Sequence, residues 1–397
     1  MKLFSLKGIL LTILGISIAS ILLMNNKKDA PASLVGEKPI ATTGESQLPD
    51  SEKKNRSTLL GFTRWPPSFD IQDIDSMYKF IDTHADIITY HVTGGVPWVE
   101  AYTDTPYSKN LQDDWSYATS HSASHLKHFV AITPLADDRK SLASYYGENT
   151  NMSLPSDWKN KTLDSNNVKQ AYLQYTKKAI ATLHPDYLAI GIEVNIAIKN
   201  KEIWEQYLQL HKYIYTEIKK TNPSLPIFAT ISLAHIDGLE DGADHDTQMK
   251  EIRRLLPYCD IVAVSAYPYG FGGRTMRTIP STFFSSIYEL AGDKPIAISE
   301  TGAPSKNFSS HFFSYKFDEE YQAAYIDFIL HEATKHNFVF LINWAAIDFD
   351  KLVDAMPMSI GKSLAALWEY TGLQTSSGVE KKALHIWDTY REKRLIQ

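Results

Sequence analysis

The chain has 397 residues, of which 44% are hydrophobic and 22% charged, and this composition excludes a wholly disordered or collagen-like protein. The formal net charge is -6, whereas a nucleic-acid-binding protein needs a basic surplus to neutralise phosphates, so we expect no nucleic-acid partner. Cys259 is the single cysteine, which excludes an intramolecular disulfide and a multi-cysteine zinc site. Aromatic residues make up 12% of the chain, a supply of flat rings that a sugar-stacking cleft would use.

The N-terminal segment has the pattern of an export signal. Lys2 and Lys7 precede an apolar run of 17 residues from Gly8 to Met24. This pattern predicts a Sec-type segment over residues 1–28. The run lies at the lower edge of the length that spans a bilayer, so it fits both a cleaved signal peptide and an uncleaved membrane anchor. We therefore expect an exported protein, secreted, periplasmic or membrane-anchored, that contacts the membrane only through this segment.

Residues 29–57 are rich in Pro, Ser, Thr, Gly, Lys and Glu and show no apolar periodicity, which predicts a flexible linker. The folded body is expected over residues 58–392. Within it, short apolar runs bounded by Asp, Gly or Pro alternate with stretches of helical period. The predicted strands are 59–62, 87–92, 129–132, 187–192, 227–232, 261–266, 296–299 and 338–342.

The segments between these strands predict helices. Apolar residues recur every three or four positions between 168 and 183, and the same pattern recurs between 203 and 218. Strands that are apolar throughout and alternate with helices indicate a parallel sheet covered by helices. Eight such units favour an α/β fold of the (β/α)₈ TIM-barrel type, in a single domain, over an open doubly wound sheet. No Gly-rich phosphate loop follows the first strand, so dinucleotide binding loses its main support and no cofactor is expected.

Two carboxylates stand at the ends of predicted strands, where a barrel of this type places its active site. Glu193 ends the fourth strand and Glu300 ends the seventh. One Glu at such a position is usually a rim residue or an ion-pair partner, but these two strands face each other across the barrel. Two carboxylates about 5–5.5 Å apart suit retaining glycoside hydrolysis, in which one attacks the anomeric carbon and the other protonates the leaving oxygen.

Two motifs around these acids resemble a known family. Gly191-Ile-Glu193-Val-Asn195 is similar to the acid/base motif of clan A glycoside hydrolases, and Ile298-Ser-Glu300-Thr-Gly302 is similar to their nucleophile motif. The resemblance spans the barrel and looks closest to endo-β-1,4-galactanase-like members. It implies Glu193 as the acid/base and Glu300 as the nucleophile, with a β-linked poly- or oligosaccharide hydrolysed with retention. The proton donor is then expected to keep its proton because of the charge on Glu300.

Aromatic residues at other strand ends support the resemblance. Tyr267 follows the sixth strand, where the clan typically has a Tyr that hydrogen-bonds the nucleophile. Trp344 follows the eighth strand, where a Trp usually forms the floor of the sugar site. Trp65 after strand one and Trp98 after strand two are expected to extend this aromatic platform, because flat rings stack on the apolar faces of sugars.

The sequence also departs from the clan. Ile192 stands where the clan usually has the Asn that binds the sugar 2-hydroxyl, and Asn195 is the candidate substitute. The clan's Arg near the end of strand two is missing; His91 stands there, and Arg64 is the candidate to supply the charge. His235 is a further candidate to line the cleft. These departures leave two alternatives open: a non-catalytic glycan-binding barrel of the cell envelope, and a structural or interaction protein whose carboxylates pair with basic neighbours.

Two groups of polar residues invite a metal-site hypothesis. His121, His125 and His128 have the spacing of one helical face, but they precede strand three, at the opposite end of the barrel from the expected site. The acidic loop 237–246 lacks the spacing of an EF-hand and is expected to be a solvated loop. We therefore predict no metal site.

Overall fold

The computed structural model describes residues 54–238, 242–267, 282–309, 314–357, 362 and 365–396. The predicted export segment 1–28 and the linker up to residue 53 lie outside the described residues. Within the described ranges, no helix has the length and apolarity needed to cross a bilayer.

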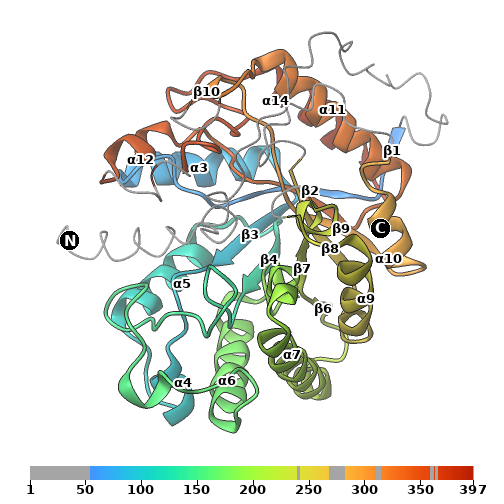
Figure 1. Ribbon diagram of the computed structural model, residues 1–397. Coiled ribbons are helices and arrows are strands. Elements are labelled where there is room, and N and C mark those ends of the chain that lie inside the picture. Colours follow the sequence, from blue (N-terminus) through green and yellow to red (C-terminus); the bar gives the residue numbers. More distant parts are fainter. Residues whose placement is uncertain are drawn as a thin grey trace.

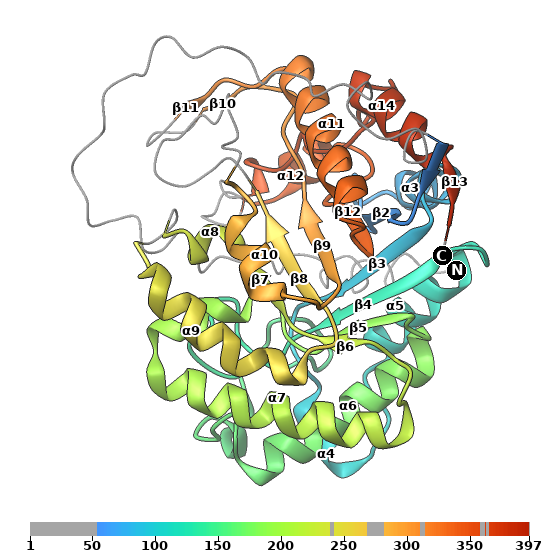
Figure 2. The same ribbon diagram turned by 90° about the vertical axis from the view of Figure 1, so that its right-hand side faces the viewer.

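A parallel sheet forms the centre of the molecule (Figures 1 and 2), with the strand order β6-β5-β4-β3-β2-β12-β9-β8-β7. Its two outer members, β6 (Ile227–Phe228) and β7 (Thr230–Ser232), are consecutive pieces of one segment, so the sheet closes into a barrel of the eight predicted strands. The predicted (β/α)₈ fold is thus confirmed. The other strands are β2 (Leu59–Thr63), β3 (Ile87–Val92), β4 (Lys127–Ile132), β5 (Tyr187–Ala189), β8 (Val262–Ala266), β9 (Ile296–Thr301) and β12 (Phe340–Asn343).

Helices surround this sheet on its outer face (Figure 2). The two periodic segments are confirmed as helices, and α7 begins where the Asn200 side chain accepts hydrogen bonds from the amides of Glu202 and Ile203. The α-helices are α3 (Ile71–His84), α4 (Trp98–Thr103), α5 (Lys109–His121), α6 (Asn166–Leu183), α7 (Lys201–Thr221), α8 (Leu233–Ile236), α9 (His245–Leu255), α10 (Ser285–Ala291), α11 (Glu319–Lys335), α12 (Asp350–Ala355) and α14 (Lys382–Arg391). Short 3₁₀ turns are η4 (Ser156–Trp158), η5 (Val194–Lys199) and η6 (Leu256–Tyr258), and a small hairpin joins β10 (Phe308–Ser309) to β11 (Ser314–Tyr315).

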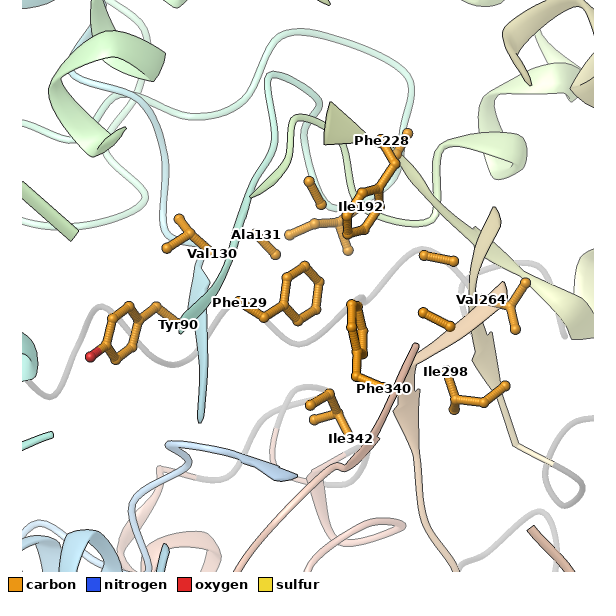
Figure 3. Close-up of a cluster of buried hydrophobic side chains, with 14 of the residues drawn as sticks. Tyr90, Phe129, Val130, Ala131, Ile192, Phe228, Val264, Ile298, Phe340 and Ile342 are labelled. Carbon is orange, nitrogen blue, oxygen red and sulfur yellow. The ribbon is translucent and has the colours of Figure 1, made fainter. Parts of the chain in front are cut away.

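The interior of the barrel is filled by side chains rather than open (Figure 3). The ring of Phe129 on β4 lies 5.0 Å from that of Phe340 on β12 and 5.6 Å from that of Phe228 on β6, measured between ring centroids. All three are buried. A packed interior of this kind fixes the strand ends, so residues that follow the strands are held in defined positions at the mouth of the barrel.

The folded body is longer than the predicted range 58–392. A short strand β1 (Asn55–Arg56) pairs in parallel with β13 (Arg394–Leu395) near the C-terminus. Arg56 is buried, forms an ion pair with Asp86 at 2.7 Å and donates a hydrogen bond to the carbonyl of Arg391. These contacts include residues that the sequence assigned to the linker, because a two-residue strand carries no apolar periodicity.

Candidate active site

The two predicted carboxylates lie at the same end of the barrel. Glu300 is the last residue but one of strand β9, and Glu193 comes shortly after the end of β5. The amide of Glu193 donates to the hydroxyl of Thr230 on β7 at 2.8 Å, and its backbone is left-handed, with φ of 47°. A left-handed backbone is a strained conformation for a residue other than glycine, and such residues cluster at functional sites. The neighbouring strand and this turn therefore fix Glu193 at the barrel mouth.

A glycine is required beside Glu193. A Cβ atom at Gly191 would lie 2.1 Å from the hydroxyl of Tyr207 on α7, which is too close for any side chain. The turn that aims Glu193 at the mouth thus depends on this close approach of the backbone to a helix.

Burial and the charge of Glu193 raise the pKa of Glu300 to about 8. The hydroxyl of Tyr267 donates to Glu300 Oε1 at 2.8 Å and lowers that pKa, and so does the positive charge of Arg139. Glu193 is therefore near enough to act on Glu300, and the pair retains one proton up to about pH 8. The sequence-based expectation placed this proton on Glu193; in the structure the raised pKa is that of Glu300, and the two coupled carboxyls share the proton, with the cation of Arg139 beside Glu193.

That cation is Arg139, which the sequence analysis missed. Arg139 is buried, and its Nη2 lies 3.6 Å from Glu193 Oε2. Its Nε donates to the carbonyl of Ile192 at 3.0 Å, and its Nη1 donates to the carbonyl of Asp137 at 2.6 Å. The guanidinium is thus held by backbone oxygens on both sides. Arg139 stands in the long loop after β4, where no sequence pattern distinguishes it from a surface residue.

Arg64 does not supply charge to the site, so that prediction is wrong. Its guanidinium forms a buried two-point ion pair with Asp114 on α5, at 3.1 and 2.9 Å, and lies over the ring of Tyr90. A buried arginine needs such a partner, and α5 provides one behind the strand ends. Arg139 is the basic residue that reaches both acids.

His91 lies beside Trp344 and near the charge of Arg139, and it does not replace a charged arginine. Burial and the charge of Arg139 lower the pKa of His91 to about 4, so its ring is neutral at physiological pH. Its ring meets that of Trp344 edge-on, at 5.4 Å between centroids.

An aromatic cluster forms one side of the mouth. The rings of Trp65 and Trp344 lie 5.0 Å apart, and Phe349 meets Trp65 edge-on at 5.7 Å. The amide of Trp344 donates to the carbonyl of Thr301, the residue after Glu300, which fixes this ring to the strand end. Trp65 and Trp344 are 3% and 7% exposed, so only a small part of either ring is accessible.

Trp368 is a further aromatic residue that the sequence analysis missed. It is partly buried, and its ring meets that of Tyr267 edge-on at 6.0 Å. It comes from the segment between β12 and α14, outside every predicted strand. Its position beside the partner of Glu300 makes it a candidate to contact a bound sugar.

Trp98 belongs to the core, and its predicted place in the platform is wrong. It is 0% exposed, and its indole N–H donates to the carbonyl of Ala143 at 2.9 Å. Its ring stacks on that of Trp158 at 5.6 Å. A tryptophan enclosed in this way cannot stack on a ligand.

The side chains of Asn195 and His235 are not accessible at the barrel mouth either. The Asn195 amide is fully buried and joins β7 to α9, since it donates to the carbonyl of Ser232 and to the side chain of Gln248, both at 3.0 Å. It cannot replace the missing Asn at position 192. His235 is also fully buried, within the short helix α8. In both cases, a position shortly after a strand end was mistaken for a position facing the mouth.

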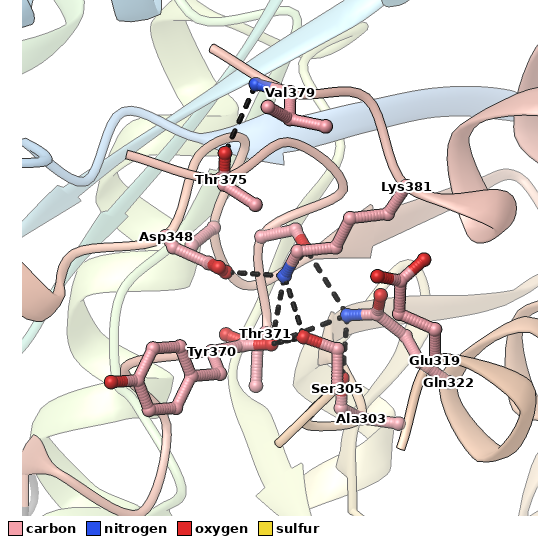
Figure 4. Close-up of polar contacts among 12 residues, drawn as sticks. Ala303, Ser305, Glu319, Gln322, Asp348, Tyr370, Thr371, Thr375, Val379 and Lys381 are labelled. Atoms are coloured by element: carbon pink, nitrogen blue, oxygen red, sulfur yellow. Dashed lines mark hydrogen bonds and ion pairs between the residues drawn. The ribbon is translucent and has the colours of Figure 1, made fainter. Parts of the chain in front are cut away.

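A buried lysine holds the loops that follow β9 and β12 (Figure 4). Lys381 is 1% exposed, and its ammonium contacts the Asp348 carboxylate at 2.6 Å, the Ser305 hydroxyl at 2.8 Å and the Gly372 carbonyl at 2.8 Å. Burial raises the pKa of Asp348 to about 7, although Lys381 opposes this shift. This network ties the loop after Glu300 to the loop after Trp344.

The histidines considered for a metal site do not converge. His121 lies 3.9 Å from Asp75 and His125 lies 3.5 Å from Asp82, each at the surface. Among the described residues, no group of three or more His, Cys, Asp or Glu side chains is arranged to hold a metal ion.

Comparisons with known proteins show similarity of fold. No family model matches the chain, and no curated protein matches it by sequence. An exo-β-1,4-mannosidase from Opitutaceae bacterium strain TAV5 is similar with a TM-score of 0.59 and 13% identity, over 86% of this chain and 61% of the mannosidase chain. A GH5_18 protein from Streptomyces cattleya in complex with Manβ1-4GlcNAc is similar with a TM-score of 0.56 and 16% identity, over 86% of this chain and 82% of that one. The chain thus spans less than two thirds of the mannosidase, and the shared part is the barrel.

Proposed function

We propose that the protein is a retaining glycoside hydrolase that cleaves a β-linked oligo- or polysaccharide. The observation that carries this proposal is the pair Glu193 and Glu300 at one barrel mouth, close enough for one charge to raise the pKa of the other carboxyl. The barrel fold shared with a β-mannosidase and with a protein bound to Manβ1-4GlcNAc supports a carbohydrate substrate. A carboxyl separation of about 5–5.5 Å stays a prediction of this mechanism.

In the first step, Glu300 attacks the anomeric carbon while Glu193 gives its proton to the departing glycosidic oxygen. In the second, Glu193 takes a proton from water, which attacks the anomeric carbon and releases Glu300. The hydroxyl of Tyr267 on Glu300 Oε1 orients the nucleophile and stabilises its charged form.

The shared proton must lie on Glu193 when the bond breaks. The two coupled carboxyls share this proton, and placing it on Glu193 leaves Glu300 ionised for the attack. The reaction therefore requires that the pair hold one proton. It stops where the pair loses its last proton and also where both carboxyls are protonated.

The surroundings of the pair suit a sugar ring. Trp344 and Trp65 pack against each other after β12 and β2, and the ring of His91 beside Trp344 is neutral and polar. Sugars are bound in protein sites by aromatic surface together with a few polar groups, so this lining supports the proposal. The similarity to endo-β-1,4-galactanase-like barrels stays a sequence-based proposal, as does an exported location, which rests on residues 1–28 alone.

The alternative is a glycan-binding barrel without turnover, and position 192 favours it. Ile192 is buried, and Asn195 is committed to Ser232 and Gln248, so neither supplies the hydrogen bond to the sugar 2-hydroxyl that the clan uses. Such a bond strengthens in the transition state and contributes several kcal/mol in glycosidases, together with substrate distortion.

A hydrolysis assay on a panel of β-linked glycans separates these functions. Residues 54–397 are the suitable protein, because Arg56 is part of the fold. We expect at least one glycan to be cleaved by this protein and not by Glu300→Gln, whose amide has the same shape but cannot form the covalent intermediate. Binding of glycans by both proteins with cleavage by neither would support the binding function instead.

A further inference from the structure

A narrow recess opens at the ends of β3 and β4, the end of the barrel at which Glu193 and Glu300 also lie. Val92 ends β3 and Thr133 follows β4, and both line the recess, as does Asp137. The recess spans about 280 Å³ of space, part of which is open solvent, and inside it there is room only for a group the size of a water molecule. A sugar ring is too large for this room, whereas a single hydroxyl group is of the right size.

Two contacts join this recess to the proposed site. Arg139 Nη1 donates to the carbonyl of Asp137, and Arg139 Nη2 lies beside the carboxylate of Glu193. The recess is thus linked to Glu193 through Arg139, which contacts the backbone of its lining and the carboxylate of the proposed acid/base.

The lining of the recess mixes polar and apolar residues and is shaped by the backbone. Gly94 and Gly95 form part of it, and a Cβ at Gly95 would lie 2.5 Å from the carbonyl of Ser144, so no side chain can fill this position. The donors of Arg139 are directed at backbone carbonyls and at Glu193 rather than at the Asp137 carboxylate. Burial raises the pKa of Asp137, and the nearby charge of Arg139 opposes this shift only in part.

We propose that this recess is a specificity site, in which the Asp137 carboxylate accepts a hydrogen bond from one hydroxyl of the bound glycan. The proposal rests on the proposed glycosidase function and deepens it, because it assigns recognition of a hydroxyl-bearing substituent to residues outside the catalytic pair. Asp137 is partly buried. A hydrogen bond to a partly buried carboxylate discriminates between ligands, since a ligand that lacks the hydroxyl does not replace the hydration that the carboxylate loses on binding.

The test pairs variants of the protein with variants of the sugar. The variants are Asp137→Ala and Asp137→Asn, and Asp138→Asn is the matched control, since Asp138 does not line the recess and caps the amide of Lys140. The probes are the glycan that is cleaved best from a panel of manno-, galacto- and gluco-configured β-linked disaccharides, and its monodeoxy analogues. We measure kcat/KM for each combination.

We expect one monodeoxy analogue to lose about 10- to 100-fold in kcat/KM with the unaltered protein and with Asp138→Asn, as for other hydrogen bonds to charged groups. Asp137→Ala is expected to lose this discrimination and to cleave the parent glycan and that analogue alike, while Asp137→Asn keeps part of it. If Asp137→Ala still discriminates between the parent glycan and that analogue, the recess is not the specificity site, whereas the proposed hydrolase function still holds. If the protein binds glycans but cleaves none, the dissociation constants of the same analogues replace kcat/KM as the test of the recess. If it neither cleaves nor binds any glycan, both the specificity site and the hydrolase function are wrong.

Discussion

Replacing Lys381 by Met is expected to destabilise the barrel severely, because it leaves a buried carboxylate without its cation. Lys381 and Asp348 are each 1% exposed, and the ammonium also serves Ser305 and Gly372. Breaking a buried pair by removing one partner costs about 3–5 kcal/mol, a large part of the about 5–15 kcal/mol by which proteins are typically stable.

The cost should depend on pH in a defined direction. Burial already holds the pKa of Asp348 at about 7 in the presence of Lys381. Without the cation this pKa rises further, so near pH 6 the carboxyl takes up a proton and escapes most of the penalty. At pH 8 the loss of stability is larger, because the unfolded chain has an ionised Asp348, and protonating this carboxyl in the folded state costs more free energy at pH 8 than at pH 6. We therefore expect the loss in unfolding free energy to be greater at pH 8 than at pH 6.

Urea unfolding at the two pH values measures this effect. Lys382→Met is the matched control, because Lys382 is the next residue, is exposed and pairs with Glu320 at the surface, where an ion pair contributes little. Adding Asp348→Asn to Lys381→Met should restore part of the stability, because the buried charge is then absent. A Lys381→Met protein within about 1 kcal/mol of the unaltered protein at pH 8 would refute the assignment of a charged buried pair.

Further predictions concern the catalytic pair. The pKa of Glu300 is raised from 4.5 to about 8 by folding, so between these pH values the folded state holds a proton that the unfolded chain has released. Glu300 therefore lowers the stability of the folded state more and more as the pH rises toward 8. Glu300→Gln should therefore melt at a higher temperature than the unaltered protein at pH 8, and the difference should shrink at pH 5. The kcat/KM of the unaltered protein should fall as the pH rises through about 8, where the pair loses its last proton; a constant value up to pH 10 would contradict this. Tyr267→Phe removes a hydrogen bond to the nucleophile and should lower kcat/KM by about 10- to 100-fold, with unchanged urea unfolding as the check on folding. Glu193→Ala should impair the hydrolysis of natural glycosides far more than that of aryl glycosides with good leaving groups, and azide should restore the second step; equal losses without an azide effect would remove Glu193 as the acid/base.

The sequence predicts the barrel well because its strands are apolar throughout and its helices are strongly periodic. The hairpin of β10 and β11 and the pair of β1 and β13 escape this reasoning, since strands of two residues carry no period. These short strands form because segments that are apart in the chain come into contact. Arg56 and Asp86, for example, are brought together by the pairing of β2 with β3.

The candidate site is predictable where a residue ends a strand directly. Glu300 and Tyr267 fall into this class, and their hydrogen bond agrees with the expectation from the sequence. Residues that reach the site from long loops, such as Arg139 and Trp368, are not predictable, because loop conformation depends on tertiary contacts. Trp98 shows the converse error, since its place after a strand end says nothing of the helix packing that buries it.

Trapping of the glycosyl-enzyme tests the central claim most directly. A 2-deoxy-2-fluoro β-glycoside of the cleaved sugar, with a good leaving group, should form the ester with Glu300 faster than water can hydrolyse it, and intact-mass measurement followed by peptide mapping locates the adduct. The proposed mechanism predicts one fluorosugar per chain, on the peptide that contains Glu300, and release of the natural product first as the β-anomer. An adduct on another residue, or a product released first as the α-anomer, would contradict it.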